Sequence, residues 1–231
     1  MSEPLVLIPG LNCTPALFAP QAERFGHDRP IVFADNRQDA TIAAMAGRLL
    51  GQAPPRFALA GLSMGGYVAL EIMRLAPHRV SRLALLDTSA RPDTEEATMR
   101  RRRLMALAEE GEFDKVHDAL WAALVHPSRR DDEELEGIVR TMMLETGPEA
   151  FVRQERAVIG RADSRPYLKA IGVPTLILVG EEDAITPVDK AEELQAGVEG
   201  AELVVVPECG HLSTLERPDA VNEALGAWLA R

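Results

Sequence analysis

Short apolar runs alternate along the chain with longer segments in which apolar residues recur every three or four positions. The runs are apolar throughout rather than at every second position, which is typical of strands that are covered on both faces in a parallel sheet. The longer segments have the periodicity of helices with one buried face. Six strands are predicted at residues 5–8, 31–34, 57–60, 83–86, 175–179 and 203–206. Helices are predicted at residues 15–25, 41–52, 63–75, 187–196 and 218–230.

One long segment breaks this alternation. Residues 91–165 contain no convincing strand, and glycine and proline residues divide them into four helical stretches. Elsewhere the alternation predicts βαβ units, whose right-handed crossovers place helices on both faces of a sheet. We therefore expect a doubly wound α/β fold with a mostly parallel sheet of about six strands. Residues 1–90 and 166–231 would form the core, with residues 91–165 as a helical insertion between the fourth and fifth strands.

A serine stands where a predicted strand meets a predicted helix. Ser63 follows the strand 57–60 and opens the helix 63–75, and ligands bind at the carboxyl ends of the strands in an open parallel sheet. Gly61 and Gly65 complete a G-x-S-x-G pattern, in which a tight turn leaves no room for a Cβ atom at the glycines and exposes the serine. The pattern predicts a nucleophilic serine; the competing interpretation is a helix N-cap.

Four stretches carry a resemblance to a known family: LVLIPGLNC at the first strand, GLSMGG at this turn, LVGEEDAITP after the fifth strand and CGHLSTLERP after the sixth. With them the chain resembles the α/β-hydrolase superfamily over nearly its whole length, and in particular its serine carboxylesterase and enol-lactonase branch. In that family an acid follows the serine and a histidine follows the acid. The resemblance therefore implies a catalytic triad of Ser63, Asp183 and His211. It also implies that the insertion is a lid, and that the sheet lacks two strands that begin the full family fold.

The chemistry assigns each member of this triad a role. His211, with an ordinary pKa near 6.5, would take the proton of the Ser63 hydroxyl near neutral pH and return it to the leaving group. Asp183 would hold the imidazole in the correct tautomer. Asp87 ends the fourth predicted strand and is the rival acid, because some members of the family draw the acid from that strand. We favour Asp183.

The tetrahedral oxyanion of acyl transfer needs two convergent hydrogen-bond donors. One is predicted to be the backbone N–H of Met64, directly after the serine. By analogy with the family, the other is the backbone N–H of Leu11, in the loop after the first strand. Many relatives have His-Gly where this chain has Pro9 and Gly10, but the glycine that lets the loop turn is kept.

The composition of the chain limits the classes of partner that the protein is expected to bind. The net charge of −11 argues against nucleic acid and anionic membrane surfaces. No apolar run approaches the roughly 20 residues of a membrane span, the first residues do not resemble a signal peptide, and we expect a cytoplasmic protein. No Cys/His cluster suggests a metal, so neither metal nor cofactor is expected. The predicted partner is a small-molecule ester, bound by a monomer or homodimer.

Several side chains of the insertion and loops have two interpretations. Trp121, Met142 and Met143 are candidates to line an adaptable apolar pocket, and packing of the insertion on the core explains them equally well. Arginines 100–103 are expected to form a solvated helix face balanced by nearby acids, with contact to an anionic substrate as the alternative. Cys13 and Cys209 are expected to remain free of disulfides.

These patterns favour a serine hydrolase that cleaves a small carboxylic ester, lactone or thioester through an acyl-serine intermediate. The serine at residue 63 argues against the epoxide-hydrolase and dehalogenase branches, which carry aspartate there. One alternative is a carbon–carbon bond hydrolase of ring-cleavage products. A second is an acyltransferase or perhydrolase, in which an alcohol, thiol or peroxide replaces water. A non-catalytic ligand receptor on the same fold is an alternative of another class.

Overall fold

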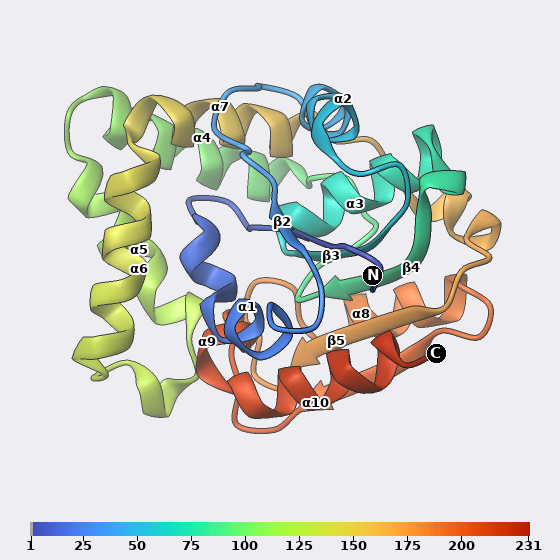
Figure 1. Cartoon of the computed structure of the whole chain (residues 1–231). Helices are drawn as coiled ribbons and strands as arrows, with labels where there is room; N and C mark the ends of the chain where they lie inside the picture. The colour runs from blue at the N-terminus through green and yellow to red at the C-terminus, as the bar shows by residue number, and fades with distance from the viewer. Residues whose placement is uncertain (1) are drawn as a thin grey trace.

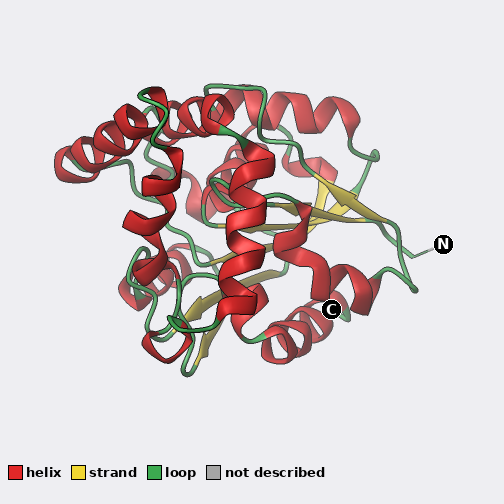
Figure 2. Cartoon of the chain, turned by 90° about the vertical axis from the view of Figure 1, so that its left-hand side faces the viewer, coloured by secondary structure: helices red, strands yellow, loops and turns green. Residues whose placement is uncertain are grey.

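The six predicted strands all form, and they pair into one parallel sheet (Figures 1 and 2). The computed structural model describes residues 2–231. The strands follow the order β2-β1-β3-β4-β5-β6, and every neighbouring pair is parallel. The predicted fold class is therefore confirmed. The strands are β1 Leu5–Ile8, β2 Ile31–Phe33, β3 Phe57–Leu62, β4 Val80–Leu86, β5 Thr175–Gly180 and β6 Glu202–Val206.

Both faces of the sheet are buried. Side chains along a strand point alternately to the two faces. In β1, Val6 and Ile8 join one apolar cluster while Leu5 and Leu7 join another, and all four are 0% exposed. This two-sided burial is the reason that the strands have continuous apolar runs rather than alternating ones.

Helices cover the two faces. The helices α2, α3 and α8 pack on one face, and α1 and α10 pack on the other (Figure 1). Because α1 and α2 lie on opposite faces, the chain reverses direction across the sheet between β1 and β3, and such a reversal opens a crevice at the carboxyl ends of the strands. The bounds are α1 Ala19–Phe25, α2 Ile42–Gln52, α3 Met64–Leu75, α8 Val188–Gly197 and α10 Pro218–Leu229.

Four helices stand between β4 and β5 and form the upper and left-hand part of the view in Figure 1. A small apolar cluster that includes Ala108, Val116 and Phe151 joins three of them. None of the helices within residues 2–231 has the length and apolarity needed to cross a membrane. The four helices are α4 Glu95–Glu109, α5 Phe113–Leu124, α6 Glu133–Thr146 and α7 Pro148–Ile159.

Some boundaries differ from the prediction, and at β4 the reason is that polar residues enter the strand. The strand β4 begins at Val80 rather than at residue 83, because Ser81 and Arg82 interrupt the apolar pattern. Arg82 is accommodated there because its Nη1 donates to the carbonyl of Leu229 at 2.7 Å. The predicted helix 15–25 divides into a 3₁₀ turn and α1, and the short helix α9 was not predicted. These and the connecting turns are η1 Pro15–Phe18, η2 Pro77–Arg79, η3 Pro127–Arg129, η4 Arg165–Ala170 and α9 Ser213–Glu216.

Candidate active site

Ser63 occupies the sharp turn between β3 and α3. Its φ is 54° and its ψ is −115°, a region that residues other than glycine rarely occupy. Neighbouring groups hold the turn: the Ser63 N–H donates to the carbonyl of Leu86 at 2.9 Å, and the Ser63 carbonyl accepts from the Thr88 hydroxyl at 2.7 Å. A strained residue that its surroundings fix in this way is a candidate for function.

The glycines around the serine are required by close backbone contacts. A Cβ atom at Gly61 would lie 2.3 Å from the carbonyl oxygen of Gly65, and one at Gly65 would lie 2.0 Å from that of Ile8. A Cβ atom at Gly66 would lie 2.4 Å from Oγ1 of Thr88, so this glycine lets α3 pack against the end of β4. These distances give the physical reason for the G-x-S-x-G pattern.

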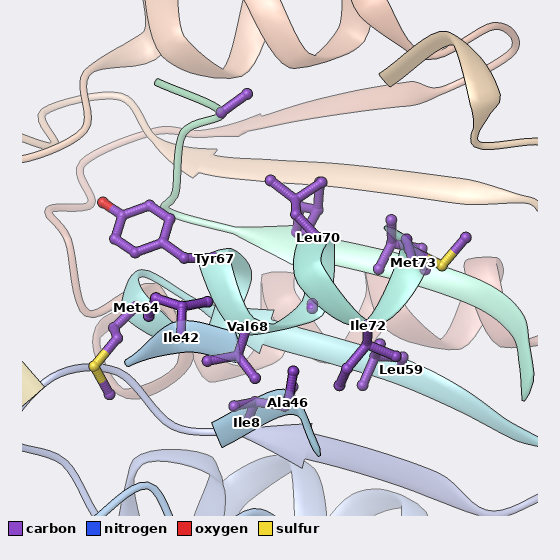
Figure 3. Close-up of a cluster of buried hydrophobic side chains, with 14 of the residues drawn as sticks. Ile8, Ile42, Ala46, Leu59, Met64, Tyr67, Val68, Leu70, Ile72 and Met73 are labelled. Atoms are coloured by element: carbon purple, nitrogen blue, oxygen red, sulfur yellow. The ribbon is translucent and has the colours of Figure 1, made fainter. Parts of the chain in front are cut away.

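The buried face of α3 fixes the turn on the sheet (Figure 3). Val68 lies beside Ile8 of β1, and Ile72 lies beside Leu59 of β3, all within one buried cluster. Apolar side chains at intervals of three and four residues along a helix share one face, which is how this helix covers two strands at once. The position of Ser63 therefore depends on the core itself.

The structure joins the predicted acid to the predicted base. His211 Nδ1 lies 2.7 Å from Asp183 Oδ2, and both residues are 3% exposed. The other carboxylate oxygen of Asp183 accepts the N–H groups of Ile185 at 2.8 Å and Thr186 at 2.9 Å. The Thr186 hydroxyl donates to Asp183 Oδ2 at 2.8 Å. These bonds orient the carboxylate towards the imidazole.

This pair shifts both pKa values. Burial alone would raise the pKa of Asp183, but His211 and the donated hydrogen bonds outweigh burial and hold that pKa below its ordinary value. Burial alone would lower the pKa of His211, but the adjacent Asp183 carboxylate outweighs it, and the pKa of the imidazole lies above its ordinary value. The pair therefore favours a charged carboxylate next to an imidazole that readily accepts a proton.

Asp87, the rival acid, is bound to other partners. It is 0% exposed, and its φ is 45°. Its Oδ1 accepts the N–H of Gly180 at 3.0 Å, and its Oδ2 accepts the hydroxyl of Ser213 at 2.5 Å. Burial, and then the nearby charge of Asp183, raise the pKa of Asp87 well above its ordinary value. Within residues 2–231 no hydrogen bond joins Asp87 to His211.

The backbone N–H groups predicted to bind the oxyanion are those of Leu11 and Met64. In the part of the chain that the structure describes, neither the Leu11 N–H nor the Met64 N–H donates to a protein acceptor. The loop after β1 reaches the serine turn, because a Cβ atom at Gly10 would lie 3.5 Å from the Cβ of Ser63. Beside this loop is a hollow of about 320 Å³, lined in part by Cys13.

One link of the predicted triad is not formed. Across residues 2–231, the Ser63 hydroxyl makes no hydrogen bond to His211. The structure brings the acid and the base together and holds the serine at the same edge of the sheet. Catalytic hydrogen bonds are often long without substrate, so the role of the serine stays a prediction.

The predicted pocket residues are packed inside the protein. Trp121 and Met142 belong to an apolar cluster of the core, and Met143 is also buried. The indole N–H of Trp121 donates to the carbonyl of Arg130 at 2.9 Å, which ties α5 to the following turn. Packing is thus what the structure shows for all three, and contact with substrate stays a prediction.

The arginine run differs from the predicted solvated face at one position. Arg101 is half-buried and pairs with Glu155 at 2.8 Å and Asp93 at 3.3 Å, two carboxylates with side chains that are almost fully buried. Asp93 also pairs with Arg161 at 2.8 Å. The remaining arginines of the run are exposed. Arg101 therefore joins α4 to α7, a contact that charge pattern alone did not indicate.

Several polar residues that support the site were not predicted. Thr186, three positions after Asp183, had a weak signal because short-range side-chain bonds of this kind are typical of aspartate turns. Glu216 accepts the N–H of His126 at 2.7 Å and that of Leu212, next to His211, at 3.2 Å. Within residues 2–231, no group of His, Cys, Asp and Glu side chains is arranged to hold a metal ion.

Comparison with known proteins defines the class of protein. A family model described as "Alpha/beta hydrolase family" matches residues 5–224. The chain belongs to this family, as the sheet order, the serine turn and the acid–histidine pair at one sheet edge indicate.

The individual proteins that this chain is similar to have names that give different activities. A Pseudomonas protein named 2-hydroxy-6-oxononadienedioate/2-hydroxy-6-oxononatrienedioate hydrolase is 28% identical over 213 residues, which is 90% of this chain and 74% of the relative. The structure of a thermophilic esterase from Thermogutta terrifontis is similar with a TM-score of 0.89 at 30% identity, covering 100% of this chain and 90% of the esterase. The enol-lactonase from Burkholderia xenovorans LB400 has a TM-score of 0.91 at 22% identity, covering 100% of this chain and 92% of that chain, and shares the fold.

Proposed function

We propose that this protein is a serine hydrolase that cleaves a small carboxylic ester, lactone or thioester. The observation that carries the proposal is the buried pair of His211 and Asp183, with Nδ1 and Oδ2 2.7 Å apart, at the edge of the sheet where Ser63 is half-buried on its turn. The likeness to the Thermogutta esterase supports the same reaction class.

In the proposed reaction, Ser63 Oγ attacks the carbonyl carbon while His211 Nε2 takes the hydroxyl proton. The carbonyl oxygen becomes an oxyanion that accepts the N–H groups of Met64 and Leu11. His211 returns the proton to the leaving oxygen or sulfur, and an acyl-serine ester remains. Water then attacks this ester with His211 as base, which releases the acid and restores Ser63. The insertion would act as the lid over this chemistry.

The test is hydrolysis of p-nitrophenyl acetate and butyrate by the wild type and by Ser63→Ala. The variant is expected to lower kcat on the order of 10⁶-fold, because no other group supplies the nucleophile. A fluorophosphonate probe should label the wild type at Ser63, located by peptide mass spectrometry, and should not label the variant. A loss below about tenfold in Ser63→Ala would remove this residue from the mechanism.

A second candidate is carbon–carbon bond hydrolysis of a ring-cleavage product by the same three residues. Its support is the likeness to the Pseudomonas hydrolase over 90% of this chain. Loss of the absorbance of 2-hydroxy-6-oxononadienedioate, with no turnover of p-nitrophenyl esters, would favour this candidate. Ester cleavage that is faster with added alcohol, thiol or peroxide would instead favour acyl transfer to those acceptors.

A further inference from the structure

Polar side chains fasten the loop after β1 on both sides of Leu11. The Pro9 carbonyl accepts from Nδ2 of Asn36 at 3.1 Å, and the Asn12 N–H donates to Oε1 of Gln154 at 2.8 Å. The Cys13 N–H donates to the Gly10 carbonyl at 3.3 Å, which closes the turn. The backbone N–H groups that follow Leu11 are therefore bound, while the Leu11 N–H has no acceptor within residues 2–231.

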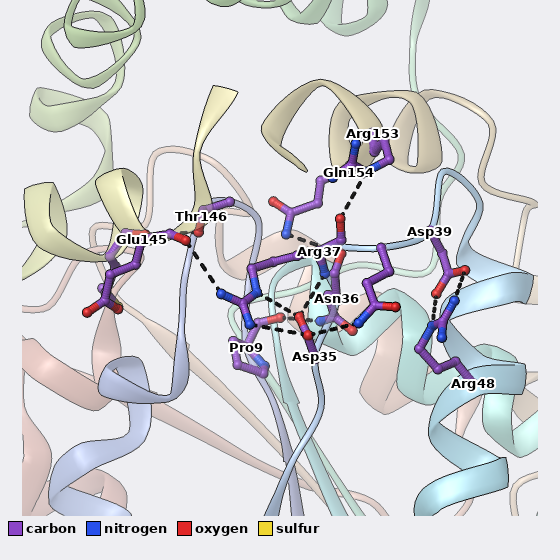
Figure 4. Close-up of polar contacts among 12 residues, drawn as sticks. Pro9, Asp35, Asn36, Arg37, Asp39, Arg48, Glu145, Thr146, Arg153 and Gln154 are labelled. Atoms are coloured by element: carbon purple, nitrogen blue, oxygen red, sulfur yellow. Dashed lines mark hydrogen bonds and ion pairs between the residues drawn. The ribbon is translucent and has the colours of Figure 1, made fainter. Parts of the chain in front are cut away.

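Gln154 belongs to the inserted helices, in the middle of α7, and is 0% exposed. Its Nε2 donates to the Asn36 carbonyl at 3.3 Å (Figure 4), so that the donor and the acceptor of its amide are both used. One buried side chain thus connects the loops after β1 and β2 to the insertion. Glutamine suits this position because its amide offers a donor and an acceptor together.

The backbone at the contact is unusual as well. Asn12 has a φ of 60°, a left-handed conformation that asparagine tolerates better than most residues. This conformation sets the direction of the peptide units around it, so the bond from Asn12 to Gln154 also bears on the orientation of the Leu11 N–H. A displacement of about 1 Å at a reacting group can cost a hundredfold in rate.

We propose that Gln154 is a positioning residue that orients the Leu11 N–H towards the oxyanion. Through Gln154, the rate of catalysis depends on the position of α7. The inference rests on the proposed function, because it takes Leu11 as an oxyanion donor. Gln154 does not touch the reacting atoms. It acts through the loop between β1 and η1, and the loop is oriented for catalysis only while α7 is in place.

The test is Gln154→Met, which keeps a similar volume and removes both hydrogen bonds. We expect kcat for p-nitrophenyl butyrate to fall about 10- to 100-fold, with KM within about threefold, because an oxyanion donor acts in the transition state. Affinity for an alkyl boronic acid, which forms a tetrahedral adduct with the serine, should fall in parallel with kcat. A merely structural role would leave that affinity unchanged in the folded variant.

Arg153→Met is the matched control. Arg153 is the neighbouring residue on α7, and its Nε donates to the Arg37 carbonyl at 2.9 Å (Figure 4). This variant also removes a bond between α7 and the loop after β2, without touching residues 9–12. Its kcat is expected to stay within about threefold of the wild type. Equal losses of kcat in the two variants would overturn the proposal.

Gln154→Glu keeps the test valid if Gln154→Met does not fold. Glutamate keeps an acceptor for the Asn12 N–H but has no donor for the Asn36 carbonyl once it is ionised, so at pH 9, where ionisation is favoured, we expect a kcat loss of about three- to tenfold relative to the wild type. If the wild type hydrolyses esters, and Gln154→Glu leaves both kcat and boronic acid affinity unchanged, this inference is overturned and the proposed function is not. A wild type that cleaves no ester, and whose Ser63 is not labelled, would overturn the proposed function.

Discussion

The segments that follow β4 and β5 each present a buried aspartate at the same edge of the sheet, and the two are used differently. Asp87 and Asp183 are 0% and 3% exposed. Asp183 accepts two backbone N–H groups and one hydroxyl and pairs with an imidazole, whereas Asp87 accepts one N–H and one hydroxyl. The pKa of Asp183 lies below its ordinary value, and that of Asp87 lies well above it.

The difference shows that the partners of a buried carboxyl decide its charge. Burial raises both pKa values, and only the added donors and the imidazole reverse that effect at Asp183. The proximity of the two groups reinforces the split, because a charged Asp183 makes ionisation of Asp87 more costly. One aspartate can therefore stabilise an imidazolium, while the raised pKa of the other favours its neutral form, and its carboxyl braces Gly180 and Ser213.

Among changes to the two aspartates and their partners, the largest effect is expected for Asp183→Asn. The amide cannot stabilise an imidazolium and favours the wrong tautomer of His211, so kcat for p-nitrophenyl butyrate should fall on the order of 10⁴-fold. Steady-state kinetics on the folded variant would measure this loss.

Asp87→Asn is its control. Because a neutral amide replaces a carboxyl whose pKa is raised well above its ordinary value, kcat should stay within about threefold of the wild type. If Asp87→Asn were the damaged variant, the assignment of the acid would have to be exchanged.

The pH dependence of kcat/KM should also be large. The base must be neutral in the free enzyme, and the pKa of His211 is raised, so activity is lost as pH falls through a value above the ordinary 6.5 or so. Below that value kcat/KM should drop about tenfold per pH unit. A profile with its midpoint below pH 6, or a flat profile, would contradict the Asp183–His211 pair as the base.

The smallest effects are expected in stability, where two hydroxyl donors can be compared. Thr186→Val removes a donor to the charged Asp183 and should cost about 1.5–3 kcal/mol in the free energy of unfolding, whereas Ser213→Ala removes a donor to Asp87 and should cost about 0.5–1.5 kcal/mol. Urea unfolding at pH 7 measures both.

The pH dependence of the stability lost in Thr186→Val follows from the direction of the Asp183 pKa shift. The lowered pKa of Asp183 gives stability above its unfolded value near 3.9, which is lost as pH falls through the folded pKa, so the cost of Thr186→Val should shrink in acid. Equal costs for the two variants at pH 7 would contradict a charge difference between the aspartates.

Local pattern was enough to predict the sheet and the serine turn. The strands have continuous apolar runs because both faces are buried, and Gly61 and Gly65 are required by backbone contacts within a few residues or with the adjacent strand. The start of β4 was missed because an arginine at residue 82 is typical of a loop. Only the folded chain shows that the Leu229 carbonyl accepts a hydrogen bond from Arg82. A prediction from local pattern therefore succeeds where neighbours along the chain supply the constraint.

The supporting polar contacts depend on distant partners. Gln154 meets Asn12 across 142 positions and Asn36 across 118, and no spacing along the chain encodes such a pair. Arg101 could not be distinguished from its exposed neighbours, because Glu155 lies 54 positions away. These residues become recognisable only when the folded chain brings a buried donor and its acceptor together.

The two cysteines have a practical consequence for covalent inhibitors. Both are free, burial raises the pKa of the Cys13 thiol to about 12, and burial likewise raises the pKa of Cys209. Thiolates rather than thiols attack electrophiles, so the raised pKa values predict that both thiols react slowly with an activity-based warhead at neutral pH. Labelling of the wild type that is lost in Ser63→Ala would then report occupancy of the proposed nucleophile, without first blocking the thiols.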